Sequence, residues 1–267
     1  MQLEPINMLW VGPTLRQLEQ QCIASFLVVG HPVSLYCYET PVGVPPGVTL
    51  CDASRILPAD RIFTYQRGSG AGSYAAFANL FRYKLLYDEG GWWSDTDVYC
   101  LRPWIFTTAH VFVREPMAQP LVHNGVIRAP AASPIMGRAY KLASAANPKT
   151  MVWGQTGSRL LTALLHADTR TTQECLYPAR TFCPIAWSNI PAAVHADHLP
   201  LSSTNVFGVH LFREMWRRHK LDVENPTICR HLAAHVHKTP VACPTPAICD
   251  KQSACRACQR AGGHHGR

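Results

Sequence analysis

A helix-like segment that runs straight into paired glycines, paired tryptophans and two aspartates constrains this 267-residue chain most. Residues 75–89 have the apolar spacing of an amphipathic helix, which Gly90-Gly91 ends. Trp92-Trp93 then leads to Asp95 and Asp97. In an extended segment, side chains two apart project to the same side, so we expect these carboxylates to stand together. A hard divalent cation carrying a diphosphate would fit between them.

The N-terminal region has the pattern of an α/β protein. Residues 6–11 read as a buried strand, and a helix is expected to follow from Thr14, its predicted N-cap, to Gly30. A second strand is predicted at 33–38. Strand, helix and strand in this order predict a parallel sheet. Further on we expect strands at 111–113 and 125–127, helices at 134–146 and 157–166, and strand or loop segments at 182–187 and 206–211.

Composition limits the class of protein. The chain is 47% hydrophobic and 16% charged, which is typical of a globular protein. No apolar run has the length of a membrane span, and the N-terminus lacks a secretory signal pattern, so a cytoplasmic location is expected. The net charge of +8 is compatible with an anionic small ligand or peripheral contact with an anionic inner membrane. This excess of basic residues is too small and too scattered to favour nucleic acid as a partner.

The composition changes near residue 238. We therefore predict one domain at 1–237 and a basic, cysteine- and proline-rich tail at 238–267 without stable structure. A zinc site in the tail is an alternative, although only its last cysteine pair has metal-site spacing. The residues concerned are Cys243, Cys249, Cys255, Cys258, His264 and His265. The single cysteines of the body are predicted to be buried thiols: Cys22, Cys37, Cys51, Cys100, Cys175 and Cys183.

Several segments in order carry a family resemblance: residues 9–12, 77–97, 124–127, 156–157, 182–184, 210–211 and 214–216. With them the chain resembles the bacterial Asp-x-Asp sugar transferases of glycosyltransferase family 32. These are related to α1,4-galactosyltransferases and yeast initiating mannosyltransferases, and more distantly to the large clostridial glucosylating toxins. The resemblance implies a GT-A type, Rossmann-like nucleotide-sugar-binding fold, with a mixed, mostly parallel sheet flanked by helices.

The resemblance also implies a metal site. Asp97 corresponds to the direct ligand of Mn²⁺ or Mg²⁺, and Asp95 to the residue that contacts the ribose and the metal-bound water. His210 corresponds to a late histidine that reaches the same metal. It lies more than a hundred residues from Asp97, so we expect the segment 206–211 to return beside the aspartates.

Other positions are implied to hold the nucleotide sugar. Arg82 corresponds to an arginine that binds the donor sugar and its diphosphate, and we count it with both aspartates as catalytic. Trp10 and Gly12 correspond to the strand end that faces the base. Trp216 is a candidate cover for the donor, with core packing as the alternative. Asn79 stands where the family has aspartate, which puts the sugar preference in question.

Some features keep other readings open. Gln155 stands where relatives can have glutamate, so no carboxylate base is evident there. An Asp-x-Asp also occurs in haloacid-dehalogenase phosphatases, but Tyr99 and the distance from the first strand disfavour that class. The loop 68–72 lacks the ending of a phosphate loop and is expected to be a lid or acceptor loop. Trp92 and Trp93 are expected to wall the cleft and fix the aspartates.

The sequence therefore predicts a metal-dependent, retaining hexosyltransferase that uses a nucleotide sugar, most simply UDP-linked, in bacterial surface polysaccharide synthesis. Its acceptor would be a glycan or a lipid-linked sugar. Retention in this family is usually explained by front-face displacement, which needs no side-chain base. Two alternatives belong to other classes: a nucleotide-sugar- or carbohydrate-binding protein with weakened catalysis, and a nucleic-acid-binding module carried by the tail.

Overall fold

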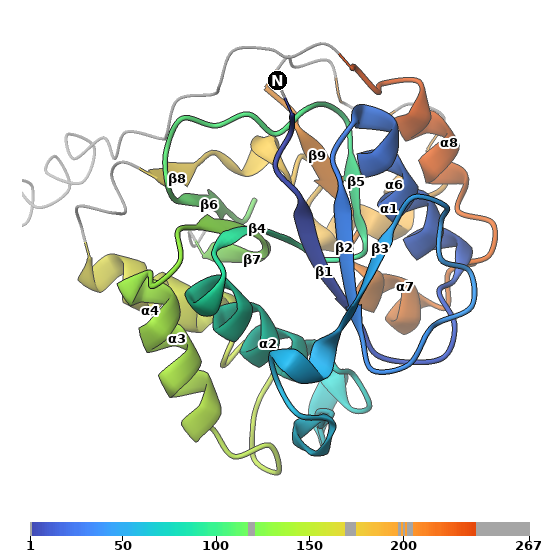
Figure 1. Ribbon diagram of the computed structural model, residues 1–267. Helices are drawn as coiled ribbons and strands as arrows, with labels where there is room; N and C mark the ends of the chain where they lie inside the picture. The colour runs from blue at the N-terminus through green and yellow to red at the C-terminus, as the bar shows by residue number, and fades with distance from the viewer. Residues whose placement is uncertain are drawn as a thin grey trace, which may run out of the picture.

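A central sheet organises the molecule (Figure 1). The computed structural model describes residues 2–116, 121–168, 175–196, 199, 201 and 205–238. Within these residues the sheet has seven strands in the order β3-β2-β1-β4-β7-β6-β8. Their bounds are Ile6–Trp10 (β1), Val33–Cys37 (β2), Thr49–Asp52 (β3), Gly91–Ser94 (β4), Val111–Arg114 (β6), Val122–Ala129 (β7) and Leu176–Tyr177 (β8).

Most of the sheet is parallel. Strand β1 pairs in parallel with β2 and β4, and β2 does so with β3. Strand β7 runs antiparallel to β4 and β6, while β6 and β8 are parallel. A separate antiparallel pair joins β5 (Val98–Cys100) to β9 (Gly208–His210). The predicted mixed, mostly parallel sheet is confirmed.

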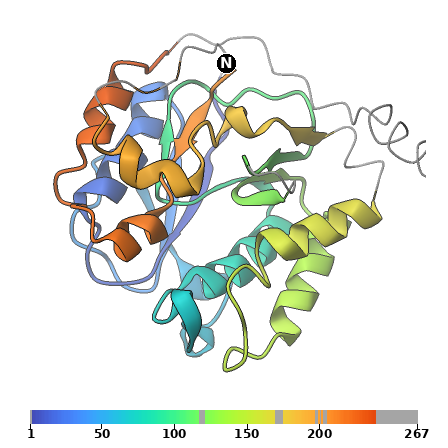
Figure 2. The same ribbon diagram turned by 180° about the vertical axis from the view of Figure 1, so that it is seen from behind.

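Helices cover both faces of the sheet (Figures 1 and 2). Helices α2, α3 and α4 pack on one face, and α1 with the β5–β9 pair, α6, α7 and α8 lies on the other. The bounds are Gln17–Val29 (α1), Ala75–Asp88 (α2), Pro134–Ala145 (α3), Ser158–Ala167 (α4), Ile190–Ala193 (α6), Arg213–His219 (α7) and Thr227–Ala233 (α8). Single 3-10 turns occur at Ala53–Arg55, Ala59–Arg61, Gly68–Gly70, Ala179–Thr181 and Trp187–Asn189.

The two tryptophans of β4 anchor opposite layers, because neighbouring strand residues project to opposite faces. Trp93 packs beside Phe81 of α2, with ring centroids 6.2 Å apart. Trp92 packs against Trp104 on the other face, at 5.0 Å. Both are buried. Trp93 therefore has the expected place in the cleft wall, whereas Trp92 faces away from it.

The first helix begins later than expected. Its N-cap is Arg16, not Thr14. The segment before it is held extended by the loop opposite: Leu15 N donates to Val42 O at 2.9 Å, and Val42 N donates to Pro13 O at 2.8 Å. The carboxylate of Glu19 accepts the Arg16 N–H at 3.1 Å, which supplies the cap. A tertiary bridge thus outweighs the local preference of threonine for capping.

The remaining predicted segments are close to the observed ones. The helices at 75–89, 134–146 and 157–166 are present to within a residue at either end. The short strands β3 and β5 were missed, the predicted strand at 125–127 is the middle of the longer β7, and residues 182–186 form a loop.

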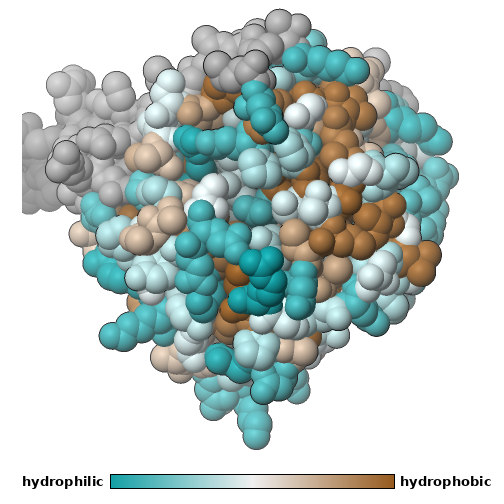
Figure 3. Space-filling model, in the orientation of Figure 1, coloured by the Kyte–Doolittle hydropathy of each residue, from teal (hydrophilic) through white to brown (hydrophobic). Residues whose placement is uncertain are grey.

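The described cysteines make no disulfide; Cys51 is only partly buried, while the other body cysteines are buried. None of the described helices has the length and hydropathy of a membrane span. Large apolar side chains are exposed at Val28, Val42 and Leu50, on the side of α1 and β3, where Figure 3 carries much of its brown surface. Residues 239–267 of the predicted tail lie outside the described residues.

Candidate active site

A cleft of about 590 Å³ opens where the chain leaves β1 and β4. Trp10 and Val11 from the end of β1 and Asp95 after β4 line it. In the sheet, β2 lies on one side of β1 and β4 lies on the other side of β1. Open α/β sheets bind their ligands at such a switch point, beyond the carboxyl ends of the strands. The cleft therefore lies where this topology places ligands.

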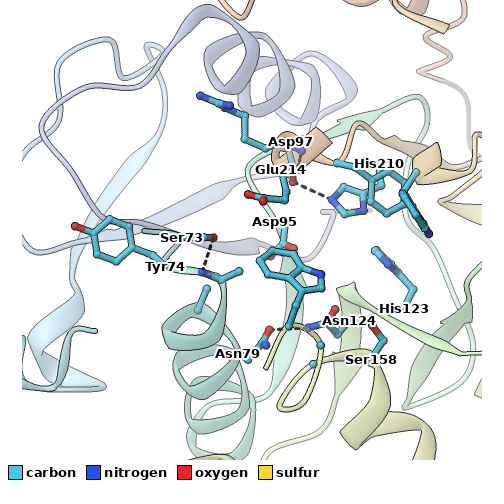
Figure 4. Close-up of a pocket in the computed structure, with 18 of the residues that line it drawn as sticks. Ser73, Tyr74, Asn79, Asp95, Asp97, His123, Asn124, Ser158, His210 and Glu214 are labelled. Atoms are coloured by element: carbon cyan, nitrogen blue, oxygen red, sulfur yellow. Dashed lines mark hydrogen bonds and ion pairs between the residues drawn. The ribbon is translucent and has the colours of Figure 1, made fainter. Parts of the chain in front are cut away.

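The two aspartates lie in a turn between β4 and β5, not in the extended segment that we expected. Val98 N donates to Asp95 O at 3.2 Å, which closes the turn. Strand β5 then pairs with β9 so that Val98 lies opposite His210, and Leu211 N donates to Asp97 O at 2.9 Å. This register brings the histidine to the aspartates (Figure 4). The two side chains that the sequence separates by more than a hundred residues are neighbours.

Asp97 is held from two sides. Its Oδ1 lies 3.1 Å from Nε2 of His210, and its Oδ2 accepts the backbone N–H of Arg213 at 2.6 Å. Burial by itself would raise the pKa of Asp97, but the charge and hydrogen bond of His210 and the N–H of Arg213 lower it to about 2. For His210, burial lowers the pKa but Asp97 outweighs it, so the net shift is upward. Asp97 is thus a fixed anion.

Asp95 is anchored through one oxygen. Its Oδ1 accepts the indole N–H of Trp93 at 3.0 Å and lies 2.9 Å from a guanidinium nitrogen of Arg82. Burial raises the pKa of Asp95, and Arg82 opposes that shift. The guanidinium carbon of Arg82 lies 4.9 Å from the centre of the Trp93 ring. Arg82 also donates to the backbone carbonyl oxygens of Ala78 and Asn124. Its buried side chain thus orients Asp95 at the cleft.

Asn79 lies one helical turn before Arg82 and lines the same cleft. Its Oδ1 accepts from Nδ2 of Asn124 at 2.6 Å, and its Nδ2 donates to Thr156 Oγ1 at 3.4 Å. A Cβ at Gly157 would lie 3.0 Å from Asn124 Nδ2 and 3.1 Å from Asn79 Nδ2, so this glycine lets the loop approach the amide pair closely. The residues at 156 and 157 therefore support the cleft floor.

The structure does not bring every predicted residue to the cleft. Trp10 lines it, but Gly12 is not among the lining residues and has a left-handed φ of 134°. Trp216 is fully buried, and its indole N–H donates to Leu211 O at 2.9 Å. The core-packing alternative therefore describes Trp216. Gln155 is exposed and accepts the N–H of Val152, away from the cleft.

Two functional-looking residues were missed. His123, on β7, is 2% exposed, and its ring centroid lies 4.7 Å from that of His210. Glu115 follows β6 and lines the cleft; burial raises its pKa, opposed by a hydrogen bond with Ser158 and by the charge of His210. A polar side chain at the end of a predicted apolar strand was the available signal for Glu115. His123 sits inside an apolar run, where histidine is more often a packing residue.

One oxygen each from Asp95 and Asp97 and one nitrogen from His210 lie within 4.8 Å of one another. Carboxylate oxygens are the ligands that Mg²⁺ and Mn²⁺ prefer, and imidazole is acceptable to Mn²⁺. The donor set therefore fits the predicted cation. Its two anchored carboxylates also need little reorganisation, because Trp93, Arg82 and the Arg213 N–H already fix them.

The turn that carries Asp95 and Asp97 lies in a segment that matches the model of a known family. Residues 51–115 match the model of the family described as "Glycosyltransferase sugar-binding region containing DXD motif". The chain carries a DXD glycosyltransferase region. Asp95-Thr96-Asp97 is its Asp-x-Asp. A search of the curated proteins finds no match.

Solved structures of similar shape are distant. The structure described as PaToxG glycosyltransferase is 14% identical, covers 86% of this chain and 85% of its own, and has a TM-score of 0.47. The apo-form glycosyltransferase GlyE of Streptococcus pneumoniae TIGR4 is 13% identical over 87% of this chain and 63% of its own, with a TM-score of 0.43. The prediction of a DXD glycosyltransferase region is thus confirmed by the family match, and membership of family 32 stays a prediction.

Proposed function

We propose that this protein is a metal-dependent, retaining hexosyltransferase. It would move a hexose from a nucleotide sugar, most simply a UDP-sugar, to a glycan or lipid-linked acceptor in bacterial surface polysaccharide synthesis. The observation that carries the proposal is the convergence of Asp95, Asp97 and His210 in one cleft, within a segment that matches a DXD sugar-binding region.

Asp95, Asp97 and His210 would hold the cation, Mn²⁺ or Mg²⁺. The bound cation would supply Lewis-acid neutralisation of the negative charge that develops on the leaving diphosphate. Two contacts support this role: the β5–β9 register brings His210 beside the aspartates, and the Arg213 N–H holds Asp97. Because neighbouring groups anchor both carboxylates, catalysis would need little reorganisation of the site.

The rest of the cleft would position the donor. Trp10, at the end of β1, offers an aromatic surface for the base. Asn79 and Asn124 offer amide groups to the hexose hydroxyls, although Asn79 lacks the charge of the aspartate that the family resemblance expects. Arg82 would act through Asp95, whose carboxylate it contacts, and through its positive charge near the diphosphate.

The direct test measures release of the nucleoside diphosphate from a panel of nucleotide sugars with and without manganese. Asp97→Asn should lower turnover by on the order of 100-fold or more, because it removes one charged ligand and little volume. Asp88→Asn is the matched control, since Asp88 is an α2 residue outside the cleft that pairs with Lys84 at the surface. Turnover of Asp97→Asn at the wild-type rate would refute the metal-site assignment.

The stereochemical outcome provides a separate check. We expect the transferred sugar to keep its anomeric configuration, and proton NMR of the product reports the configuration at C1. An inverted product would exclude the retaining mechanism and leave the cation site intact. Binding of nucleotide sugars without any turnover would favour the alternative of a catalytically weakened binding protein, for which Asn79 is the motivating residue. We place the reaction in the cytoplasm, with peripheral contact at the inner membrane face.

A further inference from the structure

A second group of potential ligands lies beside the aspartate site. His123 from β7, Cys183 from the loop after Ala179–Thr181, and His210 from β9 each offer one ligand atom, and these atoms lie within 4.8 Å of one another. His123 is 2%, Cys183 0% and His210 7% exposed. This cluster combines a sulfur with two imidazoles, whereas the aspartate site combines two carboxylates with one imidazole.

Among the described residues, hydrogen bonding leaves one ring nitrogen of each histidine without a partner. Within the described part of the chain, Nε2 of His123 and Nδ1 of His210 are buried and have no hydrogen-bond partner. A buried nitrogen without a partner is unfavourable, because it has lost its hydrogen bonds to water and gained none in return. The rings do pack against Phe212, with centroids 6.0 Å away for His123 and 4.0 Å for His210. That packing buries the carbon atoms of the rings, but it gives no hydrogen-bond partner to Nε2 of His123 or Nδ1 of His210.

We propose that His123, Cys183 and His210 form a second cation site, selective for a borderline divalent ion such as Zn²⁺. Thiolate and imidazole are the ligands that zinc takes in proteins, and three protein ligands leave a fourth position open. Tetrahedral zinc with bonds of about 2.0–2.3 Å places its ligand atoms roughly 3.5 Å apart. The three ligand atoms lie within 4.8 Å of one another in the structure, so small side-chain rotations would bring them to the zinc spacing.

The chain path supports the cluster. His210 N donates to Phe182 O at 2.8 Å, which places the residue before Cys183 against β9. His123 approaches from β7, so three separate segments meet at this point. Figure 4 shows His123 and His210 on the same side of the cleft, with Asp97 beyond His210. Because His210 belongs to both sets, a cation at the sulfur-containing site would compete with one at the aspartates for this ring.

Cobalt substitution tests the proposal, because a thiolate bonded to Co²⁺ gives a charge-transfer band that oxygen and nitrogen ligands do not. The full chain is used with its tail cysteines changed to serine, so that any band reports on the body. These are Cys243, Cys249, Cys255 and Cys258. We expect one equivalent of Co²⁺ with the band, displaced by Zn²⁺. Absence of the band would overturn the proposal.

Variants in this background assign the ligand. Cys183→Ser should abolish the band, and Cys100→Ser, at an equally buried thiol that donates to Arg102 O, should keep it. A band that persists in Cys183→Ser would refute the site. Asp97→Asn should keep the band, because Asp97 is not one of the three proposed ligands. Loss of sugar transfer in this variant would therefore not contradict the proposed second cation site.

A second measurement covers the case in which Cys183→Ser does not fold. His123→Gln, checked by circular dichroism for the native fold, should weaken Zn²⁺ binding by about tenfold or more in equilibrium dialysis. An unchanged Zn²⁺ affinity in the folded His123→Gln protein would return this cluster to core packing.

Discussion

At the scale of single residues, a glycine controls how closely the site can assemble. Gly125, on β7, lies where a Cβ would come within 2.6 Å of His123 Nε2 and 2.9 Å of Asp95 Oδ2. Both separations are below those that real Cβ atoms adopt, so a larger residue must displace one of the two side chains. The backbone at position 125 also holds Asp95, whose N–H donates to Gly125 O at 2.8 Å. Glycine at position 125 therefore lets the side chains of His123 and Asp95 lie close to the β7 backbone at the cleft.

We predict that Gly125→Ala weakens manganese binding and lowers turnover by about tenfold or more, while the fold survives. Overpacking a core position costs about 1–3 kcal/mol, so the melting temperature should drop by a few degrees. Gly137→Ala is the matched control: its Cβ would lie 2.8 Å from the ring of Tyr87, which is 40% exposed and can swing away, outside the cleft. Wild-type manganese affinity in Gly125→Ala would show that close approach is unnecessary.

Elements differ in how far the sequence predicts them. Helices with repeated apolar spacing, such as α2 and α3, were found because packing one face needs a pattern that neighbouring residues display. The strands β3 and β5 are four and three residues long, too short for a period to emerge. The late start of α1 depends on Val42, which contacts the segment only after the chain has folded back.

One buried histidine ties several elements together and should give the protein an acid-sensitive stability. His31, after α1, accepts the Trp104 N–H through Nε2 at 2.9 Å, and its Nδ1 lies 2.9 Å from Glu4 O. The first bond requires Nε2 to be unprotonated. Burial lowers the pKa of His31 below the usual 6.5. Well above pH 6.5 both the folded and the unfolded forms are neutral, so this group has no effect on the pH dependence of stability there.

Below pH 6.5 the unfolded chain binds a proton that folded His31 resists, so the free energy of unfolding should fall as the pH drops. The slope from one such group approaches about 1.4 kcal/mol per pH unit and levels off below the folded pKa. We predict that His31→Gln, although less stable at pH 7, has a shallower slope between pH 5 and 6.5 in urea unfolding. His166→Gln, on the exposed side of α4, controls for loss of an imidazole. Equal slopes in His31→Gln and wild type would contradict the prediction.

At the scale of the whole molecule, the last described residues contact the body. His237 N donates to Leu101 O at 2.7 Å, just after β5. The residue at the predicted domain limit therefore contacts the body, and the limit itself stays a prediction. Before it, α8 buries Ile228 and Leu232 completely in the cluster that surrounds Trp216. The last described helix is thus part of the core.

We predict that a chain ending at Lys238 folds and turns over like the full chain, with a melting temperature within about 2 °C. The prediction rests on the change of composition at that point, and calorimetry with a transfer assay measures it. A chain ending at Asn225 is the contrasting variant: it loses Ile228 and Leu232 and should lose several kcal/mol of stability. Strong destabilisation of the longer chain would show that the tail packs on the body.

Local patterns in the sequence were sufficient for the α/β class, for α2 and for the block that holds Asp95 and Asp97, because periodicity and turn residues act between near neighbours. The resemblance added His210. Only the tertiary structure placed His123 and Glu115 at the cleft and Cys183 beside His123, since this convergence depends on the pairing of β5 with β9 and on the position of β7 in the sheet. Such registers join residues a hundred positions apart, and no spacing along the chain encodes them.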